Sequence, residues 1–461
     1  MIAGERVAAD ERVAAREVDL VVLVNGFPRL SETFVLQELL DLERRGLRLM
    51  VFALSQPEEV VRQEAFAQLR ARVQYVPAAV LLSRPRVARA HAMLAHRRGP
   101  RYIEALVRVR RSADATPSAI KRATVLARQI VERGSPPLYI HFAHKPGTVG
   151  RFAAQLAGVP YAISCHAKDI WLTPPEEMAP KLRDAELALT CTAAGKLELE
   201  RHAAGRTPVR LVHHGTDVEA VVPRREPSGP PRVLSVGRLV EKKGYDTLIR
   251  AAAVLRDRDV AFELRIVGDG VLWPELQRLV HTLDLARQVT FMGPLSPQEL
   301  HREWASAAVF ALACRQLPNG DRDGLPNVVM EAMVQGLPVI GTMQPGIAEA
   351  VRHGHSGLLV APDDPPALAD ALRRALAEPA LARQLGARAQ ESVRERFDCR
   401  RLLPAVAAAL ADAGLIRPSE PATSSPAGAP APALSRSAPP LVPLPARSAT
   451  PSAPLTELGA V

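Results

Sequence analysis

Aromatic residues, long apolar runs and paired cysteines are all scarce in this chain of 461 residues. Phe, Trp and Tyr together make up 4% of the residues. No uninterrupted apolar run approaches the ~18 residues that a membrane-spanning helix requires. The four cysteines form no CxxC pair, which favours reduced thiols and a cytoplasmic setting. We therefore expect a globular protein of two or three domains that does not cross a membrane.

Lysine is also rare, at seven residues, so nearly all the positive charge is arginine. Residues 80–130 contain twelve Arg or Lys and two acids, an excess equal to the net charge of +10 for the whole chain. Apolar residues alternate with these arginines, as is typical of a basic amphipathic helix on an anionic membrane surface. An ordinary basic face on a core-packed helix is the alternative. Nucleic acid is disfavoured because Tyr102 is the only aromatic residue in the segment.

The N-terminus, MIAGERVAADERVAAREVDL, is charged and lacks the apolar centre of a signal peptide. This pattern favours a cytoplasmic protein, with peripheral attachment to the inner face of the plasma membrane as an option. The termini differ in composition from the rest: residues 1–17 are a charged lead-in, and residues 418–461 form a Pro/Ala/Ser-rich tail that we expect to be disordered.

Predicted strands and helices alternate along the rest of the chain, which indicates parallel, doubly wound sheets. A Pro/Gly-rich joint at residues 223–231 is typical of a linker. We expect an N-terminal domain over residues 18–222 and a C-terminal domain with closing helices over residues 232–417. The strands expected in the first domain are 20–24, 48–53, 138–142, 161–165, 186–190 and 209–212. Those expected in the second are 233–236, 262–267, 289–292, 309–313, 339–341 and 357–360.

Residues 319–342 are the most informative stretch, because they place Asp323 and Glu331 eight positions apart. Pro326 suits the first turn of a helix, and Gly336 suits the end of the same helix. The unpaired N–H groups of a helix N-terminus favour a phosphate or sugar oxygen. No Cys or His lies nearby to complete a metal site. The two acids therefore favour recognition of hydroxyl groups on a sugar nucleotide.

A basic loop, Gly237–Gly244, follows a predicted strand and contains two of the seven lysines. Arg238 and Lys243 lie five positions apart and could clamp both phosphates of a nucleoside diphosphate. A solvated basic turn is the alternative, which the acids in the same domain make less favourable. Gly268-Asp269-Gly270 ends the next strand, at the same edge of the sheet. It is a weaker candidate, because Gly-Asp-Gly is also typical of a plain turn.

Two such domains joined by a short linker form a cleft between them, and His166 ends a strand of the first domain where a ligand in that cleft would meet it. It could bond a sugar hydroxyl, although His141, His144, His213 and His214 compete for this role and a structural role is also open. Gly26 follows the first strand and could let a substrate approach the backbone, with Ser31 as a helix cap beyond it. No cluster of His, Cys and Asp has the spacing of zinc ligands, so the sequence predicts no metal and no cofactor.

These motifs in combination resemble the retaining family 4 glycosyltransferases of GT-B fold. The resemblance covers about residues 18–415. In the second half it rests on Ser235-Val236-Gly237-Arg238, Lys243-Gly244, Val267-Gly268-Asp269-Gly270, Asp323–Asn327 and Glu331–Val339. Phe27–Phe34 and His166–Trp171 are similar to the branch of colanic acid and exopolysaccharide glycosyltransferases.

The resemblance implies an α/β fold with two doubly wound Rossmann-like domains facing an interdomain cleft. It assigns the catalytic roles to Arg238 and Lys243 at the departing diphosphate and to His166 and Asp323 at the transferred sugar. Asp323 replaces the commoner Glu and is one methylene shorter. The resemblance also implies residues that bind the nucleotide-sugar donor. Glu331 would bind its ribose, and the other donor-binding residues would be Gly26, Gly237, Gly268, Asp269, Gly324, Leu325 and Asn327.

The expected activity is metal-independent transfer of a hexose, with retention, from a UDP- or GDP-linked sugar to a surface polysaccharide on a lipid-linked acceptor. The diphosphate would leave from the same face of the anomeric carbon that the acceptor attacks, and Arg238, Lys243 and helix amides would stabilise its charge. Two alternatives stay open. One is another enzyme of this fold, such as a sugar-nucleotide epimerase or a sucrose-type synthase, and the other is a non-catalytic protein that binds a membrane surface.

Overall fold

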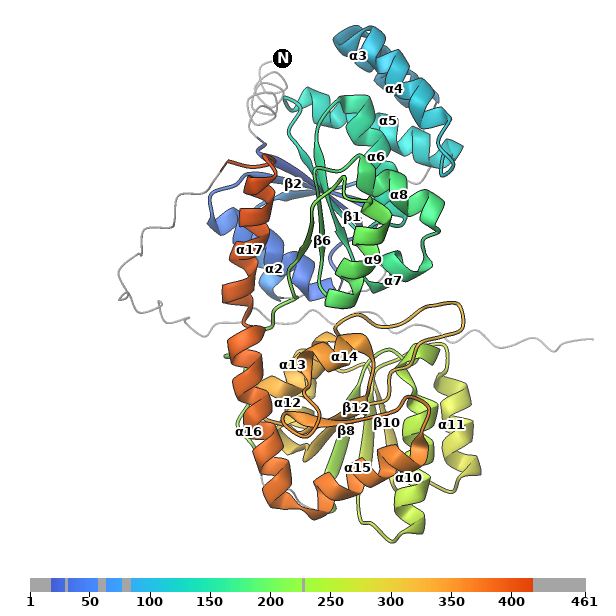
Figure 1. The fold of residues 1–461 in the computed structure, drawn as a ribbon, viewed down its shortest axis with the longest axis vertical. Helices are drawn as coiled ribbons and strands as arrows, with labels where there is room; N and C mark the ends of the chain where they lie inside the picture. The colour runs from blue at the N-terminus through green and yellow to red at the C-terminus, as the bar shows by residue number, and fades with distance from the viewer. Residues whose placement is uncertain (1–17, 30–31, 57–63, 77–83, 226–228, 418–461) are drawn as a thin grey trace, which may run out of the picture. The chain divides into compact units, whose positions relative to one another are not determined.

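The computed structural model describes residues 18–29, 32–56, 64–76, 84–225 and 229–417. The predicted lead-in and the predicted tail both lie outside these residues. Two parallel sheets account for the described strands, and helices cover both faces of each sheet (Figure 1). The alternation of strands and helices that the sequence predicts is therefore confirmed.

The first sheet has seven strands in the order β3-β2-β1-β4-β5-β6-β7, all parallel. Its strands are β1 Leu20–Gly26, β2 Leu49–Ser55, β3 Arg72–Tyr75, β4 Leu138–His141, β5 Tyr161–Cys165, β6 Leu187–Thr190 and β7 Val209–Leu211. The helices among them are α2 Thr33–Arg44, η2 Glu64–Gln68, α3 Arg84–Arg98, α4 Pro100–Arg110, α5 Pro117–Glu132, α6 Lys145–Ala157, α7 Ala167–Leu172, α8 Pro175–Arg183 and α9 Ala193–Ala203.

The second sheet has six parallel strands in the order β10-β9-β8-β11-β12-β13. They are β8 Arg232–Val236, β9 Glu263–Val267, β10 Val289–Gly293, β11 Val309–Leu312, β12 Val339–Thr342 and β13 Gly357–Val360. The helices are η4 Glu241–Lys243, α10 Tyr245–Asp257, α11 Trp273–Thr282, α12 Pro297–Ser306, α13 Asn327–Val334, α14 Pro345–Ala350, α15 Pro365–Ala377, α16 Pro379–Arg396 and α17 Cys399–Asp412.

The central strands are apolar without interruption because both of their faces are buried. In β1, Val21 and Leu23 enter one core, whereas Leu20, Val22 and Val24 enter the core on the other face. Strands β8 and β11 divide their side chains between two cores in the same way. This two-residue alternation places one hydrophobic core on each face of each sheet.

Some local predictions differ from the structure. Pro326 precedes α13 in an extended conformation, so the helix begins at Asn327 and not at the proline. Ser31, the predicted cap of the first helix, lies outside the described residues, and the N-cap of α2 is Glu32. The sequence also missed β3, a short edge strand whose four residues are all at least partly exposed. Gly336 follows α13 with a φ of 66°, as the prediction requires.

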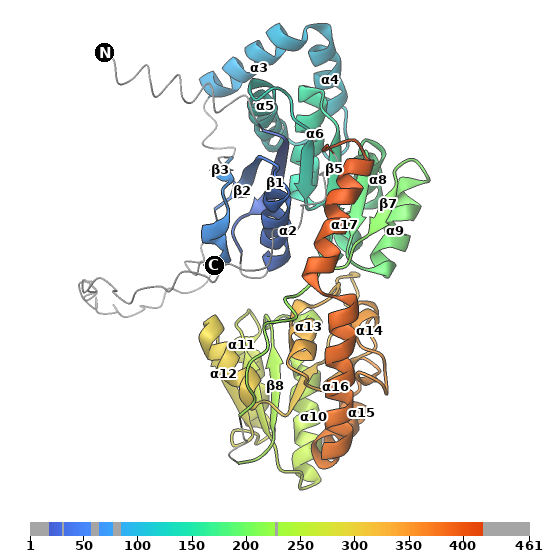
Figure 2. The same cartoon turned by 90° about the vertical axis from the view of Figure 1, so that its left-hand side faces the viewer.

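Helix α17 packs against α2 of the first half of the chain, although the sequence groups it with the second half. Its buried face, which includes Val406 and Leu410, belongs to the same core as Leu20 and Val22 of β1. The crossing is fixed by two backbone hydrogen bonds, from Thr216 N–H to the Phe397 carbonyl and from Cys399 N–H to the Thr216 carbonyl. Figure 2 shows α17 beside the first sheet.

The described part of the basic segment, residues 84–130, includes α3, α4 and nearly all of α5, and most of its arginines are exposed. On α4, Tyr102 and Val109 face the core, whereas Ile103 and Val107 are 53% and 42% exposed. Among the helices that the structure describes, none is both long enough and apolar enough to cross a bilayer.

Candidate active site

The predicted site residues lie at the carboxyl ends of the strands, because parallel strands end at one edge of their sheet. In the second half, Gly237 follows β8, Gly268 follows β9, and the stretch 313–326 joins β11 to α13. In the first half, Gly26 ends β1 and His166 follows β5. A Cβ atom on Gly268 would lie 2.0 Å from the Gly237 carbonyl oxygen, so the absence of a side chain at Gly268 lets the two predicted loops contact each other.

The basic loop is a short helical turn that directs its two lysines inward. Lys242 and Lys243 lie in η4 and are each 8% exposed. Gly244 ends the turn in the left-handed region, with a φ of 65°. Arg238 lies at the beginning of the same loop, is exposed, and has no side-chain hydrogen bond or ion pair to any described residue.

Asp323 is surrounded by donors and cations. Its carboxylate lies 2.6 Å from Lys243 Nζ and 3.5 Å from Lys242 Nζ. The Cys314 thiol donates a hydrogen bond to it over 3.3 Å. Burial would raise the pKa of Asp323, but the two ammonium groups outweigh burial and hold this pKa below its ordinary value. Lys243, a predicted phosphate ligand, is therefore paired with a predicted sugar ligand.

Lys242 also bonds Asp321 at 2.9 Å, a contact that the sequence does not single out. The spacing of Arg238 and Lys243 suits two phosphates, so the sequence predicts a role for these two residues and none for Lys242. Lys242 lies between the two acids, so Asp323 keeps a cation beside it even when Lys243 turns toward another anion.

Glu331 lies in α13 with its carboxylate largely desolvated. Burial raises the pKa of Glu331 to about 7. No described residue donates a hydrogen bond to this carboxylate or forms an ion pair with it. A buried carboxylate without a partner is stabilised by a ligand that donates hydrogen bonds to it. The two adjacent hydroxyl groups of a ribose would donate such bonds.

The remaining donor candidates are backbone positions or exposed side chains. The Leu325 side chain is buried in the core, so only its backbone is available to a ligand. Asn327 begins α13, and no side chain caps this helix, so first-turn N–H groups stay available. Asp269 is exposed, and its Oδ1 accepts a hydrogen bond from the Gly270 N–H at 2.7 Å. Such a bond is typical of a plain turn, the second interpretation that the sequence allowed for Gly268-Asp269-Gly270.

His166 belongs to a stack of aromatic rings at the end of the first sheet. Its ring centroid lies 4.8 Å from Phe34 and 5.0 Å from His214. Nε2 of His166 lies 3.1 Å from Ser164 Oγ. Burial lowers the pKa of His166 well below its ordinary value, and the neighbouring histidines lower it further. An imidazole that stays neutral can bond hydroxyl groups and adds no positive charge to the site.

Three of the rival histidines, His141, His144 and His214, belong to the same group, whereas His213 lies apart, with its Nε2 3.1 Å from Glu349. His141 stacks on His166, and burial lowers its pKa to about 3. His144 Nδ1 lies 3.3 Å from Asp169, whose carboxylate also accepts the His166 backbone N–H. The sequence presents these residues as competitors, but the structure places His141, His144 and His214 with His166 in one cluster of rings whose pKa values burial lowers.

Three side chains in this cluster could also hold a metal ion. The ligand atoms of His166, Cys191 and His214 lie within 4.8 Å of one another. The sequence predicts no metal because these residues are far apart in it. They converge because they follow β5, β6 and β7, which are adjacent strands of one sheet.

The two sets of loops contact each other. The Arg322 guanidinium lies 3.9 Å from the ring centroid of Trp171 in α7. A Cβ atom on Gly324 would lie 3.4 Å from Ala167 Cβ, at the beginning of the same helix. Glu349 of α14 accepts a hydrogen bond from the Ala193 N–H at 2.8 Å. The Asp323 loop therefore faces the His166 loop.

Two Rossmann-like parallel sheets whose strand-end loops face each other define the GT-B fold, as predicted. The structure of Anabaena HepE with UDP and glucose has this fold, with a TM-score of 0.64 and 17% identity over 86% of this chain and all of that chain. This likeness concerns the fold alone.

The chain belongs to the glycosyl transferases group 1 family, whose model matches residues 230–378. A GDP-mannose-dependent phosphatidylinositol monomannoside mannosyltransferase of Mycolicibacterium smegmatis is 30% identical over 57% of this chain and 73% of that protein. WcaL of Escherichia coli (strain K12), which is named for a glycosyltransferase role in colanic acid biosynthesis, is 31% identical over 50% of this chain. The chain spans 57% of the length of WcaL.

Proposed function

We propose that the protein transfers a hexose, with retention of configuration, from a nucleoside diphosphate sugar to a surface polysaccharide on a lipid-linked acceptor. The observation that carries this proposal is the half-buried Glu331 carboxylate, which has no partner among the described residues and lies in the same domain as Lys242 and Lys243. A desolvated acid for the ribose and a buried cation, Lys243, for the diphosphate match the two ends of a nucleoside diphosphate, while Lys242 stays beside Asp323.

In the proposed reaction, the bond between the anomeric carbon and the diphosphate oxygen breaks while the acceptor hydroxyl oxygen bonds the same face of that carbon. The hydroxyl proton passes to the departing phosphate oxygen, so no protein base is required. Arg238 and Lys243 stabilise the charge that develops on the diphosphate, which makes a metal ion unnecessary. His166 and Asp323 bond hydroxyl groups of the sugar.

Donor binding has to compete with the ion pair between Lys243 and Asp323. A diphosphate dianion or trianion is a stronger partner for Lys243 than a single carboxylate. Lys242, 3.5 Å from Asp323, balances that acid when Lys243 turns to the phosphate. Asp323 is then released to accept hydrogen bonds from the transferred sugar. The same step thus assembles both the phosphate and the sugar contacts.

Calorimetric titration with UDP, GDP and ADP in the presence of EDTA tests the donor site. We expect one nucleotide to bind, and Glu331→Ala to weaken it about tenfold or more, because hydrogen bonds to a charged acceptor are lost. Glu391→Ala on the exposed face of α16 is the matched control and should bind as wild type. Absence of binding for all three nucleotides would contradict the proposal.

The products distinguish transfer from the alternatives. A transferase converts the donor only when an acceptor is present, and nuclear magnetic resonance of the product reports whether the anomeric configuration is retained. An epimerase would release an isomer without an acceptor. A protein that binds vesicles but no nucleotide would be the non-catalytic alternative.

Attachment to an anionic membrane surface is the second proposal, and the exposed Ile103 and Val107 beside the arginines of α3 and α4 favour it. Such a location would bring a lipid-linked acceptor to the site.

A further inference from the structure

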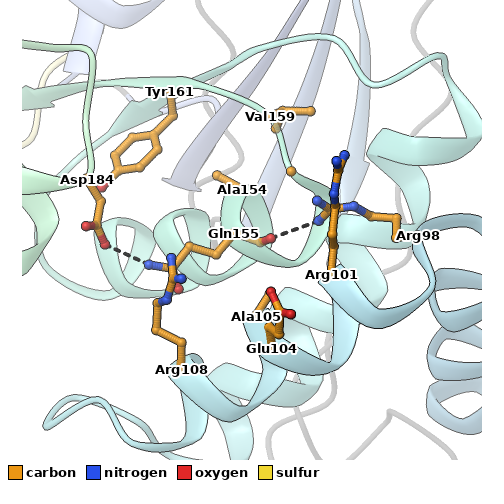
Figure 3. Close-up of a pocket in the computed structure, with 11 residues that line it drawn as sticks. Arg98, Arg101, Glu104, Ala105, Arg108, Ala154, Gln155, Val159, Tyr161 and Asp184 are labelled. Carbon is orange, nitrogen blue, oxygen red and sulfur yellow. Dashed lines mark hydrogen bonds between the residues drawn. The ribbon is translucent and has the colours of Figure 1, made fainter.

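A cavity of about 420 Å³ lies between α4, the end of α6 and the beginning of β5. Its lining includes Arg98, Arg101, Arg108, Gln155 and Asp184 (Figure 3). The cavity is at the amino ends of the strands, because Tyr161 begins β5 and Asp184 precedes β6. It is therefore at the opposite edge of the sheet from His166 and is separate from the candidate active site.

Arg98 is held in place at this cavity. Its Nη1 donates hydrogen bonds to the carbonyl oxygens of Gln155 and Leu156, at 2.9 and 2.7 Å, which end α6. A Cβ atom on Gly158 would lie 2.0 Å from Arg98 Nη2, so the guanidinium rests where a larger residue would exclude it. Burial lowers the pKa of Arg98, and the positive charge of Arg101 lowers it further. The fixed guanidinium thus faces a second cation.

Arg101 and Arg108 lie seven positions apart, on one face of α4, with Glu104 and Ala105 between them. Neither arginine has a side-chain hydrogen bond or ion pair to a described residue. Asp184 is already occupied, by Arg151 at 3.1 Å and by Gln155 Nε2 at 2.7 Å.

The remaining charges in the lining are three arginines and Glu104, so two positive charges have no counterpart in the cavity. Guanidinium groups match the geometry of phosphate oxygens, and two positive charges match a phosphate monoester dianion. The volume falls within the range of ligand pockets and leaves room for a small polyol attached to the phosphate.

We propose that this cavity binds the phosphate group of a phosphorylated polyol through Arg98, Arg101 and Arg108. Figure 3 shows Arg98 and Arg101 at one side of the cavity and Arg108 nearer to Asp184. The phosphate lies between the two sides, and the polyol extends over Ala105 and Val159. A soluble polyol phosphate and a phospholipid head group share this chemistry. The site does not depend on the transfer activity, because none of its residues contacts the candidate active site.

The test is titration of the full chain with glycerol 3-phosphate, with uncharged glycerol as the reference. We expect saturable binding of glycerol 3-phosphate, weakened about tenfold for each guanidinium removed in Arg101→Gln and Arg108→Gln. Arg110→Gln with Arg111→Gln is the matched control, because these two residues at the end of α4 are exposed and do not line the cavity. Thermal melting of each variant checks that the fold persists. Arg98 is left unchanged because its hydrogen bonds to the last carbonyl groups of α6 also contribute to the fold.

Vesicles containing phosphatidylglycerol distinguish the two sources of phosphate. If glycerol 3-phosphate displaces the protein from these vesicles, the cavity takes a lipid head group. If it binds without displacing the protein, the cavity takes a soluble phosphorylated polyol. No saturable binding up to about 10 mM, or equal binding by the Arg101→Gln and Arg108→Gln double variant and wild type, would overturn the proposal.

Discussion

Two acids on one loop-and-helix unit have opposite pKa shifts, and the difference lies in their partners. Asp323 has two ammonium groups beside it, which hold its pKa low despite burial. Glu331 has burial alone, which raises its pKa to about 7. Near neutral pH the first acid is ionised, whereas the second divides between its two forms. A donor group from a ligand would complete the environment of Glu331 and favour its ionised form.

This shift makes the stability of the fold depend on pH. The pKa of Glu331 is about 7 in the folded chain and ordinarily 4.5, so between these values the folded chain binds more protons than the unfolded chain. The free energy of unfolding therefore falls as pH rises through this window. We expect Glu331→Gln to be more stable than wild type by roughly 1–3 kcal/mol at pH 8, and by clearly less at pH 5.

Urea denaturation at the two pH values measures this difference. Glu391→Gln, at an exposed position, is the control and should change stability equally at both. An effect of Glu331→Gln that is the same at pH 5 and pH 8 would mean that the carboxylate is not desolvated in the folded protein.

At the scale of the element, the η4 turn is what directs the lysines. Gly244, the residue that follows η4, has a φ of 65°, and a Cβ atom there would lie 1.9 Å from the Ala313 carbonyl oxygen. The turn is thus held against the end of β11, the strand that leads to Asp323. The position of Lys243 depends on this approach as much as on its own ion pair.

Replacing Gly244 by Ala separates the turn from β11. Gly205 is a matched control because it has a φ of 73° and a Cβ atom there would have no neighbour within 4 Å, so its replacement adds backbone strain alone. We expect Gly244→Ala to lower the free energy of unfolding by about 1–3 kcal/mol more than Gly205→Ala. Nucleotide binding should also weaken in Gly244→Ala only. Equal losses for the two variants, with nucleotide binding intact, would contradict this account.

The alternation of elements could be predicted from the sequence because buried parallel strands are short apolar runs between turn residues. Strands β5 and β13 have the predicted boundaries. The edge strand β3 could not be found this way, because its residues Arg72–Tyr75 have no buried side to mark it. The packing of α17 on α2 could not be predicted either, because periodicity indicates a helix and not its neighbour.

The candidate site was predicted as a set of loops but not as a set of contacts. Strand-end loops follow from topology, so the positions of His166, Lys243 and Asp323 at the sheet edges could be expected. The pairing of Lys243 with Asp323 and the convergence of His166, Cys191 and His214 depend on side-chain directions across separate strands. A single sequence does not encode such directions in its spacing.

At the scale of the whole molecule, the positive charge is concentrated where α3 and α4 are exposed. Ile103 and Val107 lie one turn apart on α4, and Arg110 and Arg111 follow on the same solvent side. Apolar side chains between arginines suit the boundary between head groups and acyl chains. The remainder of the chain is nearly neutral, so this surface is where an anionic membrane would attract the protein.

Neutralising that surface should weaken membrane binding. For Arg110→Gln with Arg111→Gln we expect about a fivefold loss of affinity per arginine for phosphatidylglycerol vesicles, with a larger loss at low salt. Arg383→Gln with Arg394→Gln removes two exposed arginines from α16, outside this surface, and serves as the control. Vesicle sedimentation at two salt concentrations measures the affinity of each variant and its dependence on salt. Binding that is unchanged in the double variant would leave these arginines as a solvated face of the helix.

The return of α17 to the first sheet sets an order of events during synthesis. Residues 18–222 leave the ribosome long before residues 399–412 are made, and until then the face of α2 that Val406 and Leu410 cover is open to water. The half that is translated first is therefore completed last. A nascent chain interrupted after α16 carries an exposed apolar seam, which is the kind of surface that chaperones bind and proteases remove.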